Sequence, residues 1–176
     1  DMMKADGIVM TPEQIPLDDA EVYAMISAGD TDGVFQLESS GMRLFLQSMK
    51  PACFEDIIAA ISLYRPGPMD SIPRYVAGKN NPDTVHYETP LLKPILEVTY
   101  GCMVYQEQVM QIVRDLAGYS MGRSDLVRRA MAKKKHDVML KEKHYFIHGM
   151  EENGKITEEV KAGLEDVAAK RLGEAA

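Results

Sequence analysis

Residues 106–135, QEQVMQIVRDLAGYSMGRSDLVRRAMAKKK, decide how this chain folds. The first part, residues 106–117, predicts an amphipathic helix, because apolar residues recur on one side at helical spacing: Val109, Ile112, Val113 and Leu116. Gly118 and Gly122 predict a turn after this helix, and a second helix follows the turn. Residues 106–135 are therefore expected to form two helices joined by a short turn.

The second predicted helix has an apolar stripe of its own. On a helical wheel of about 100° per residue the stripe covers about 140°. Its members, which are expected to be buried, are Leu126, Val127, Ala130 and Met131. A longer helix would turn Lys134 back into this stripe, so the helix is expected to end near residues 132–133.

Positive charge gathers on and after this helix, although the whole chain has a formal net charge of −7. Residues 123–143 carry eight Lys and Arg against three Asp and Glu, and residues 1–38 carry one Lys against nine Asp and Glu. One explanation is structural, since lysines at the end of a helix complement its dipole. The other is a ligand: Arg128 and Arg129 flank the small Ala132, and guanidinium groups bind phosphate oxygens bidentately. A polyphosphate is the ligand that this second explanation predicts.

The remaining chain predicts short helices with little else. Its 176 residues suit one ordinary domain. Apolar periodicity predicts helices in 19–28, 41–50, 54–64, 69–78, 136–150 and 157–173. Asp18 or Asp19 is expected to cap the first of these helices and Gly29 to end it. Residues 33–39 and 99–105 are expected to be extended. The predicted fold class is therefore mainly α, a compact multi-helix unit with one or two short extended segments.

Two patterns imitate metal sites. Asp30 and Asp32 have the spacing that places two carboxylates on one side of a strand, but glycines flank them, so a turn is expected. His144 and His148 lie on one helix face, as zinc ligands do, but no glutamate lies between them and no other ligand pattern is near. Partly buried or surface histidines are the favoured interpretation, and no metal site is expected.

The cysteines and the chain's hydropathy exclude other classes. Cys53 and Cys102 lack the CxxC spacing of a zinc site, so two buried thiols are expected. No apolar run reaches the ~20 residues that cross a bilayer, and the first ten residues lack a signal-peptide pattern. A cytoplasmic protein without a membrane partner is therefore expected.

Four long motifs resemble one protein family. They are DGVFQLESSGMRLFL (32–46), FEDIIAAISLYRPGPMDS (54–71), YGCMVYQEQVMQI (100–112) and GYSMGRSDLVRRAMAKKK (118–135). In this order they resemble the α subunit of bacterial DNA polymerase III, the C-family replicative polymerase, from about Ile15 to Gly154. The resemblance implies a segment connecting palm and fingers at 1–38, the fingers region at 39–154, and a C-terminal helix at 155–176 that departs from the family pattern.

The resemblance implies a role in DNA replication, as part of a DNA-directed DNA polymerase, a nucleotidyltransferase. The family's arginine pair falls on Arg128 and Arg129, which implies contacts with the triphosphate of the incoming dNTP. Weaker candidates for nucleotide or template contacts are Arg65, Arg123, Lys133, Lys134 and Lys135. Arg65 has an equal alternative, hydrogen bonding to the carbonyls at the end of its helix. Tyr105, Gln106 and Glu107 belong to a family motif, but their roles are expected to be structural. The Gln and Glu side chains can accept hydrogen bonds from the unpaired amides at a helix start.

The resemblance also says what the chain lacks. Polymerases of this class use Mg²⁺ held by carboxylates, and the family's aspartates belong to palm segments that precede Asp1. No catalytic residue and no metal ligand are therefore expected here, and the isolated chain is expected to be inactive. Primer–template DNA and dNTP are the implied partners; the sliding clamp and other replisome subunits would bind regions outside this sequence. The alternative is a noncatalytic helical module that binds phosphate or nucleic acid.

Overall fold

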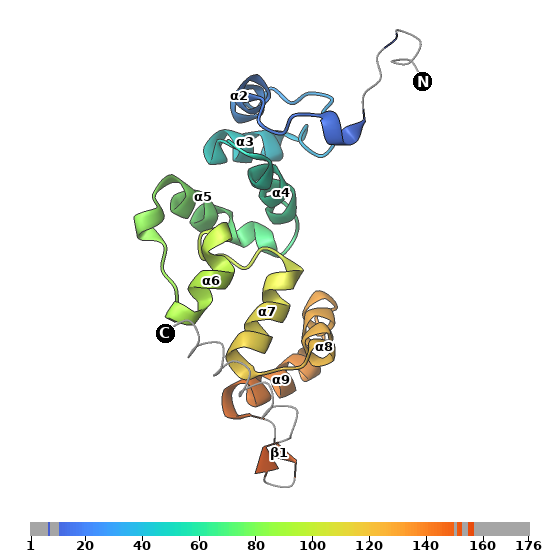
Figure 1. Cartoon of the computed structure of the whole chain (residues 1–176), viewed down its shortest axis with the longest axis vertical. Helices are drawn as coiled ribbons and strands as arrows, with labels where there is room; N and C mark the ends of the chain where they lie inside the picture. The colour runs from blue at the N-terminus through green and yellow to red at the C-terminus, as the bar shows by residue number, and fades with distance from the viewer. Residues whose placement is uncertain (1–6, 8–10, 150, 153–154, 157–176) are drawn as a thin grey trace. The chain divides into compact units, whose positions relative to one another are not determined.

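A computed structural model of the chain describes residue 7, residues 11–149 and the pairs 151–152 and 155–156. The described residues contain eight α-helices, α2 to α9, with short 3-10 helices between them (Figure 1). The prediction of a mainly α fold is confirmed. The chain divides into two compact units, Asp1–Pro82 and Asp83–Ala176. The predicted division into 1–38, 39–154 and 155–176 concerns regions of the resembled polymerase and stays a prediction.

The first unit is a set of short helices. They are η1 (Pro12–Gln14), α2 (Ala20–Ala28), α3 (Ser40–Met49), α4 (Phe54–Leu63), η2 (Pro68–Ser71) and α5 (Ile72–Asn80), followed by η3 (Pro82–Thr84). Asp19 caps α2, since its Oδ1 accepts hydrogen bonds from the amides of Glu21 (2.9 Å) and Val22 (3.2 Å). Gly29 ends α2 with φ +73°. The predicted cap and end of this helix are confirmed.

Helix α3 supplies more buried apolar residues to the core of this unit than any other of its helices. One of its faces is buried and packs against α2 and α5: Met42, Phe45, Leu46 and Met49. Phe45 also stacks on Tyr64, with ring centroids 6.4 Å apart. Ala59, Ala60 and Leu63 of α4 are buried as well. Burial of apolar surface stabilises a fold by about 25 cal/mol per Å², so the buried face of α3 contributes to the stability of the unit.

The segment between α2 and α3 differs from its predicted extended form. Residues 33–39 form turns, and Gln36 has a positive φ of 65°. The buried Thr31 hydroxyl donates to the carbonyl of Leu37 at 2.6 Å, which closes the segment on itself. The turn predicted for the Asp30–Asp32 pair is confirmed, and Asp32 forms an ion pair with Arg43 at 2.6 Å. Its carboxylate is thereby engaged by an arginine.

The second unit contains residues 106–135, with their two helices and the turn between them. Its elements are η4 (Pro90–Leu92), α6 (Lys93–Leu96), η5 (Glu97–Thr99), α7 (Gln106–Ala117), α8 (Met121–Ala132) and α9 (His136–His148), with the strands β1 (Glu151–Glu152) and β2 (Lys155–Ile156). The two strands pair antiparallel, which the sequence did not predict. Residues 102–104 form an irregular link rather than a strand. The helix predicted for 157–173 lies outside the described residues.

Local signals set the ends of α7 and α8. Gly118 ends α7 with φ +68°, and the Ser120 hydroxyl caps α8 by accepting from the amide of Arg123 at 3.3 Å. Helix α8 then packs against both α7 and α9. Its end at Ala132 confirms the predicted stop. No helix in the described part of the chain is long and apolar enough to span a membrane.

The buried stripe of α8 is narrower than predicted. Val127 and Ala130 are buried as expected, together with Ser124. Leu126 and Met131 are 42% and 41% exposed, so their predicted burial is wrong. The helical wheel predicted one broad buried face. Because α8 packs against both α7 and α9, only the narrow line of Ser124, Val127 and Ala130 is buried. Ser124 fits that line because its hydroxyl donates to the Ser120 carbonyl at 2.8 Å and is not left unpaired.

The start of α7 depends on one buried amide, that of Gln108. Its Oε1 accepts hydrogen bonds from the amides of Val104 and Tyr105, each at 2.9 Å. Its Nε2 donates to the Thr99 hydroxyl at 2.8 Å and to the Ile95 carbonyl at 3.2 Å. The amide thus joins α6, η5 and the link before α7. The structural role expected of the neighbouring Gln106 and Glu107 falls to Gln108.

A buried ion pair joins α8 to α9. The Arg123 guanidinium donates from Nε and Nη2 to both carboxylate oxygens of Glu142 at 3.0–3.1 Å. It also lies 5.1 Å and 4.9 Å from the ring centroids of Tyr119 and Tyr145. Burial and the Glu142 charge raise the pKa of Tyr119 to about 12, so its hydroxyl stays protonated and donates to the Glu142 carbonyl. This cluster fixes the angle between α8 and α9.

Replacing Gln108 should destabilise the second unit. In Gln108→Leu, two amides, a hydroxyl and a carbonyl lose a buried partner, so we expect a loss of at least about 3 kcal/mol in the free energy of unfolding. Gln111→Leu, on the exposed side of α7, is the matched control and should change it by less than about 0.5 kcal/mol. Urea unfolding followed by far-UV circular dichroism measures both. Equal stabilities for the two variants would contradict the role given to Gln108.

Candidate functional site

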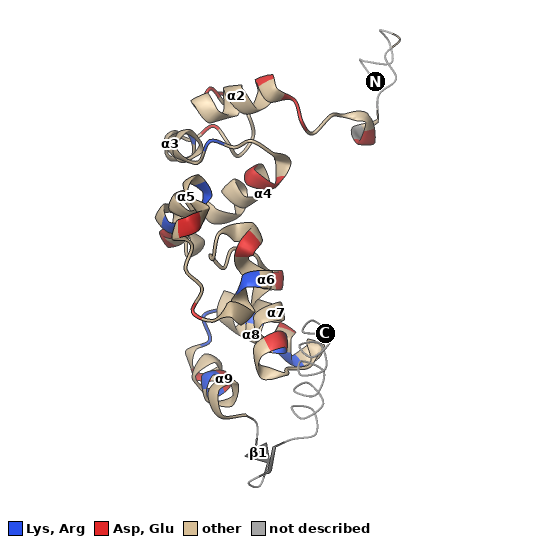
Figure 2. Ribbon diagram, turned by 60° about the vertical axis from the view of Figure 1, so that its left-hand side comes forward, with Lys and Arg blue, Asp and Glu red and all other residues tan. Residues whose placement is uncertain are grey.

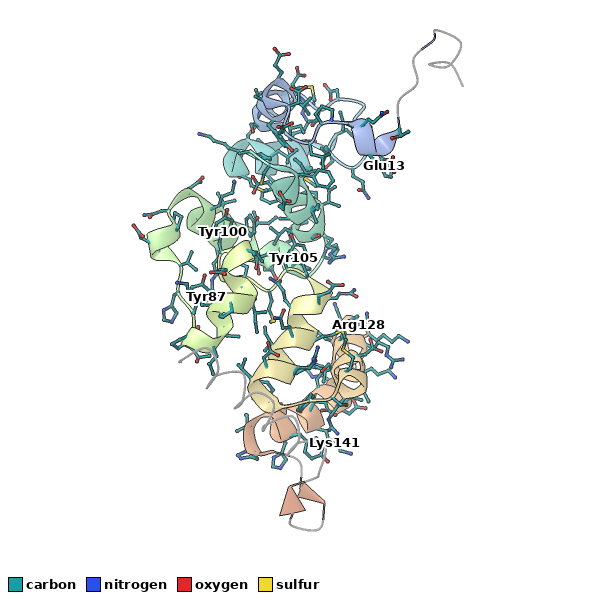
Figure 3. All side chains as sticks on the ribbon, viewed as in Figure 1. Glu13, Tyr87, Tyr100, Tyr105, Arg128 and Lys141 are labelled. Carbon is teal, nitrogen blue, oxygen red and sulfur yellow. The ribbon has the colours of Figure 1, made fainter. Side chains whose placement is uncertain are left out.

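Arg128 is held in one orientation by two elements. Its Nε and Nη2 donate to Asp125 Oδ1 at 2.8 Å and 2.6 Å, and its Nη1 donates to Gln106 Oε1, on α7, at 2.7 Å. Figure 3 labels Arg128 on the ribbon of α8. Both Nη atoms keep a second N–H, because a guanidinium carries two hydrogens on each. Arg128 is therefore fixed in place with donor capacity left over.

Arg129 is bound to the second oxygen of the same carboxylate. Its Nη2 lies 2.9 Å from Asp125 Oδ2, and its side chain is 60% exposed, against 27% for Arg128. Hydrogen bonds from Arg128, with the charges of both arginines, hold the pKa of Asp125 below its usual range. Asp125 is therefore ionised at neutral pH, and one carboxylate bridges two guanidinium groups.

A surface pocket of about 320 Å³ lies beside Arg129, between α8 and α9. Three of its lining residues are cations and three are apolar: Arg129, Lys133, Lys135, Leu126, Ala130 and Val138. Arg128 is not among them. This hollow, the cationic pocket, therefore lies next to the arginine pair and exposes mainly apolar atoms between its three basic residues. Figure 2 marks the basic and acidic residues along α8 and α9.

The three lysines form the turn that ends α8. The Lys134 and Lys135 amides donate to the carbonyls of Met131 (3.1 Å) and Ala130 (2.9 Å), a bonding pattern typical of helix ends. Lys134 has φ +50°, a left-handed conformation in which glycine is more common. All three lysine side chains are exposed, including Lys134, which the early stop of the helix keeps out of the apolar stripe. Both explanations offered for the lysines remain compatible with this position.

Two other candidates have surroundings of a different kind. Arg123 is engaged with Glu142 and two tyrosine rings, so its described contacts are structural, and a nucleotide contact stays a prediction. Arg65 belongs to the other compact unit, in the exposed turn after α4. Among the described residues its guanidinium makes no hydrogen bond to the carbonyls at the end of α4. The backbone amide of Arg65 instead donates a hydrogen bond to the carbonyl of Leu63 at 2.8 Å.

The metal-like patterns do not assemble into larger clusters. The rings of His144 and His148 lie on one face of α9, 4.8 Å apart, and both side chains are exposed. Within residues 11–149 and the other described positions, no group of three or more His, Cys, Asp or Glu could hold a metal ion. Cys102 is buried, but Cys53 is exposed, so the expectation of two buried thiols is wrong for Cys53. Cys53 precedes the first residue of α4, where its side chain faces solvent.

Sequence reasoning missed Asp125 and Gln106 as parts of the site. Asp125 entered only as one charge in a sum, although its spacing of three and four residues from the arginines places all three side chains on one helix face. That spacing is the signal that could have found it. Gln106 carried no such signal, because it reaches Arg128 across 22 positions of sequence.

Comparison with known proteins agrees with these motifs. Residues 1–154 match the bacterial DNA polymerase III alpha subunit finger domain. The chain is 50% identical over 148 residues to DNA polymerase III subunit alpha of Staphylococcus aureus strain Mu50, which covers 84% of this chain and 14% of that protein. Identity to the same subunit of Staphylococcus epidermidis strain ATCC 12228 is 50% over 142 residues, or 81% and 13% of the two chains. The chain thus spans about one seventh of these relatives, and it belongs to the bacterial DNA polymerase III alpha subunit finger domain family.

Proposed function

We propose that Arg128 and Arg129 bind the triphosphate of an incoming dNTP, and that the chain acts as the fingers region of a replicative DNA-directed DNA polymerase. The observation that carries the proposal is the shared carboxylate of Asp125, which holds both guanidinium groups side by side with N–H donors unused. Guanidinium pairs match phosphate oxygens in geometry and charge. Membership of the finger-domain family supports the same reading.

The pocket beside Arg129 extends the proposed site. Lys133 and Lys135 line it together with Arg129, and Lys134 lies in the turn between them. Ammonium groups attract phosphates without the directional demands of a guanidinium, so these lysines suit a template strand or the outer phosphates of a nucleotide. We assign them to nucleotide or template contacts, with Arg65 and Arg123 as weaker candidates.

The remaining parts of the reaction are proposed to come from outside this chain. The described cluster consists of arginine and lysine donors around one engaged carboxylate, which does not fit a Mg²⁺ site, because Mg²⁺ prefers oxygen ligands in octahedral geometry. The catalytic Mg²⁺ would be held by carboxylates elsewhere in the polymerase. Primer–template DNA, the sliding clamp and a cytoplasmic location belong to the same proposal, as properties of the whole enzyme.

Nucleotide binding can be tested on the 176-residue chain by NMR. Addition of a dNTP with Mg²⁺ should shift the backbone amides of residues 121–135, because phosphate oxygens would replace water around Arg128 and Arg129. The shifts should disappear in a variant that carries both Arg128→Ala and Arg129→Ala. Arg114→Ala, an exposed arginine on α7, is the matched control and should keep them. Shifts that persist in the folded double variant would contradict the proposed triphosphate site.

The lysines can be tested by the salt dependence of binding to single-stranded DNA. Replacing Lys133, Lys134 and Lys135 by Gln should reduce the slope of log K against log salt by about 2 if all three contact phosphates, since each contact releases counterions. The matched control replaces Lys93, which lies on α6, by Gln and should leave the slope unchanged. Fluorescence anisotropy over a salt series gives the slopes. An unchanged slope in the triple variant would remove the lysines from the interface.

Primer extension separates a binding module from a catalyst. We expect the purified chain to bind nucleotide without incorporating it, because two-metal phosphoryl transfer needs a carboxylate site that the described cluster does not fit. A full-length DNA polymerase III α subunit serves as the positive control on the same primer–template. Extension of the primer by the 176-residue chain would contradict the proposal.

A further inference from the structure

We infer that Asp125 is a positioning residue, which aligns Arg128 and Arg129 for a triphosphate. The inference rests on the proposed function and adds a residue to it. A carboxylate beside a phosphate site is expected to weaken anion binding by charge alone. The geometry around Asp125 indicates instead that this carboxylate strengthens anion binding. The two explanations can therefore be separated, because they predict opposite changes in affinity when Asp125 is replaced.

Asp125 uses few of the donors that a phosphate would need. Its Oδ1 accepts hydrogen bonds from Nε and Nη2 of Arg128, and its Oδ2 forms an ion pair with Nη2 of Arg129 at 2.9 Å. Within the described residues, the Nε and Nη1 groups of Arg129 take part in no ion pair or hydrogen bond. The carboxylate therefore holds the two guanidinium groups while leaving most of their edges open.

The two arginines depend on Asp125 to different degrees. Arg128 has a second anchor, since Gln106 Oε1 accepts from its Nη1 at 2.7 Å. Arg129 has Asp125 alone among the described residues, and it is also the member of the pair that lines the cationic pocket. Without Asp125, the long side chain of Arg129 would sample many rotamers in solvent. Binding would then have to restrict that motion, which reduces affinity.

Asp137 provides a control for charge. It is an exposed residue in the first turn of α9, next to Val138, which lines the same pocket. Among the described ion pairs it has no basic partner. Asp125→Asn and Asp137→Asn each remove one negative charge near the cationic pocket, but only the first removes a link to the arginines. Charge alone predicts that both substitutions strengthen anion binding.

The experiment measures binding of inorganic triphosphate, without metal, to the 176-residue chain by NMR titration. We expect Asp125→Asn to weaken binding about threefold, from the lost ordering of Arg129, and Asp137→Asn to leave it unchanged or tighten it up to about twofold. Asp125→Glu keeps a carboxylate within reach of the same donors and should restore at least half of the loss. The Nε–H signals of Arg129, recorded without ligand, should report faster side-chain motion in Asp125→Asn than in the parent chain.

The outcomes distinguish this inference from the proposed function. If the parent chain does not bind triphosphate, the proposed function fails and the inference fails with it. If the parent binds and Asp125→Asn binds equally or more tightly, only the inference is overturned, and Asp125 is a competitor of phosphate. A change in melting temperature without a change in affinity would likewise assign Asp125 a purely structural role. Weaker binding together with faster Arg129 motion supports the inference.

Discussion

The buried side-chain amide of Gln108 is the interaction on which the second unit depends. Its two ends hold four backbone and side-chain groups from α6, η5 and the link before α7. The link needs such a partner, because Val104 and Tyr105 precede α7 and have no helix or strand to satisfy their amides. The amide also fixes the first turn of α7, from which Gln106 reaches Arg128. An apolar contact could not do this, since it has no direction.

The carboxylates of Glu142 and Asp125 both bind arginines of α8, but they differ in burial and therefore in what their ion pairs do. Glu142 is buried, and the guanidinium of its bidentate partner Arg123 lies against two tyrosine rings with only 20% of the side chain exposed, so little of either charge is offered to solvent. Asp125 is partly exposed, and the guanidinium groups that it holds keep donors on their outer edges. Removing one partner of a buried pair leaves an uncompensated charge, whereas an exposed pair is worth little to stability. The first pair therefore supports the fold and the second leaves arginines available to an anion.

The helix ends that depend on neighbouring residues could be predicted from the sequence. The cap expected at Asp18 or Asp19, the stops at Gly29 and Gly118 and the end of α8 near Ala132 each depend on neighbouring residues, and all were confirmed, with Asp19 as the cap. Gly122 was expected in the turn and lies within α8. The helical wheel of α8 failed at Leu126 and Met131 because burial depends on which helices pack against it. The roles of Gln108 and Gln106 were missed for the same reason, as their partners lie up to 22 positions away in sequence.

Resemblance and geometry contribute separate parts of the functional argument. Family motifs and the residue pattern around Ala132 pointed to Arg128 and Arg129. The structure adds that one carboxylate, Asp125, bridges them, at the three- and four-residue spacing that the sequence already contained. The turn after α8 adds a further physical sign. Lys134 adopts a left-handed conformation that costs a non-glycine residue about 1 kcal/mol, and glycine would fit the same backbone without strain. Glycine is the more common residue in this conformation, and the exposed lysine that occupies it adds a positive charge to the turn. Because the turn lies beside the pocket of Arg129, Lys133 and Lys135, that charge falls where a polyphosphate or a DNA strand would be attracted.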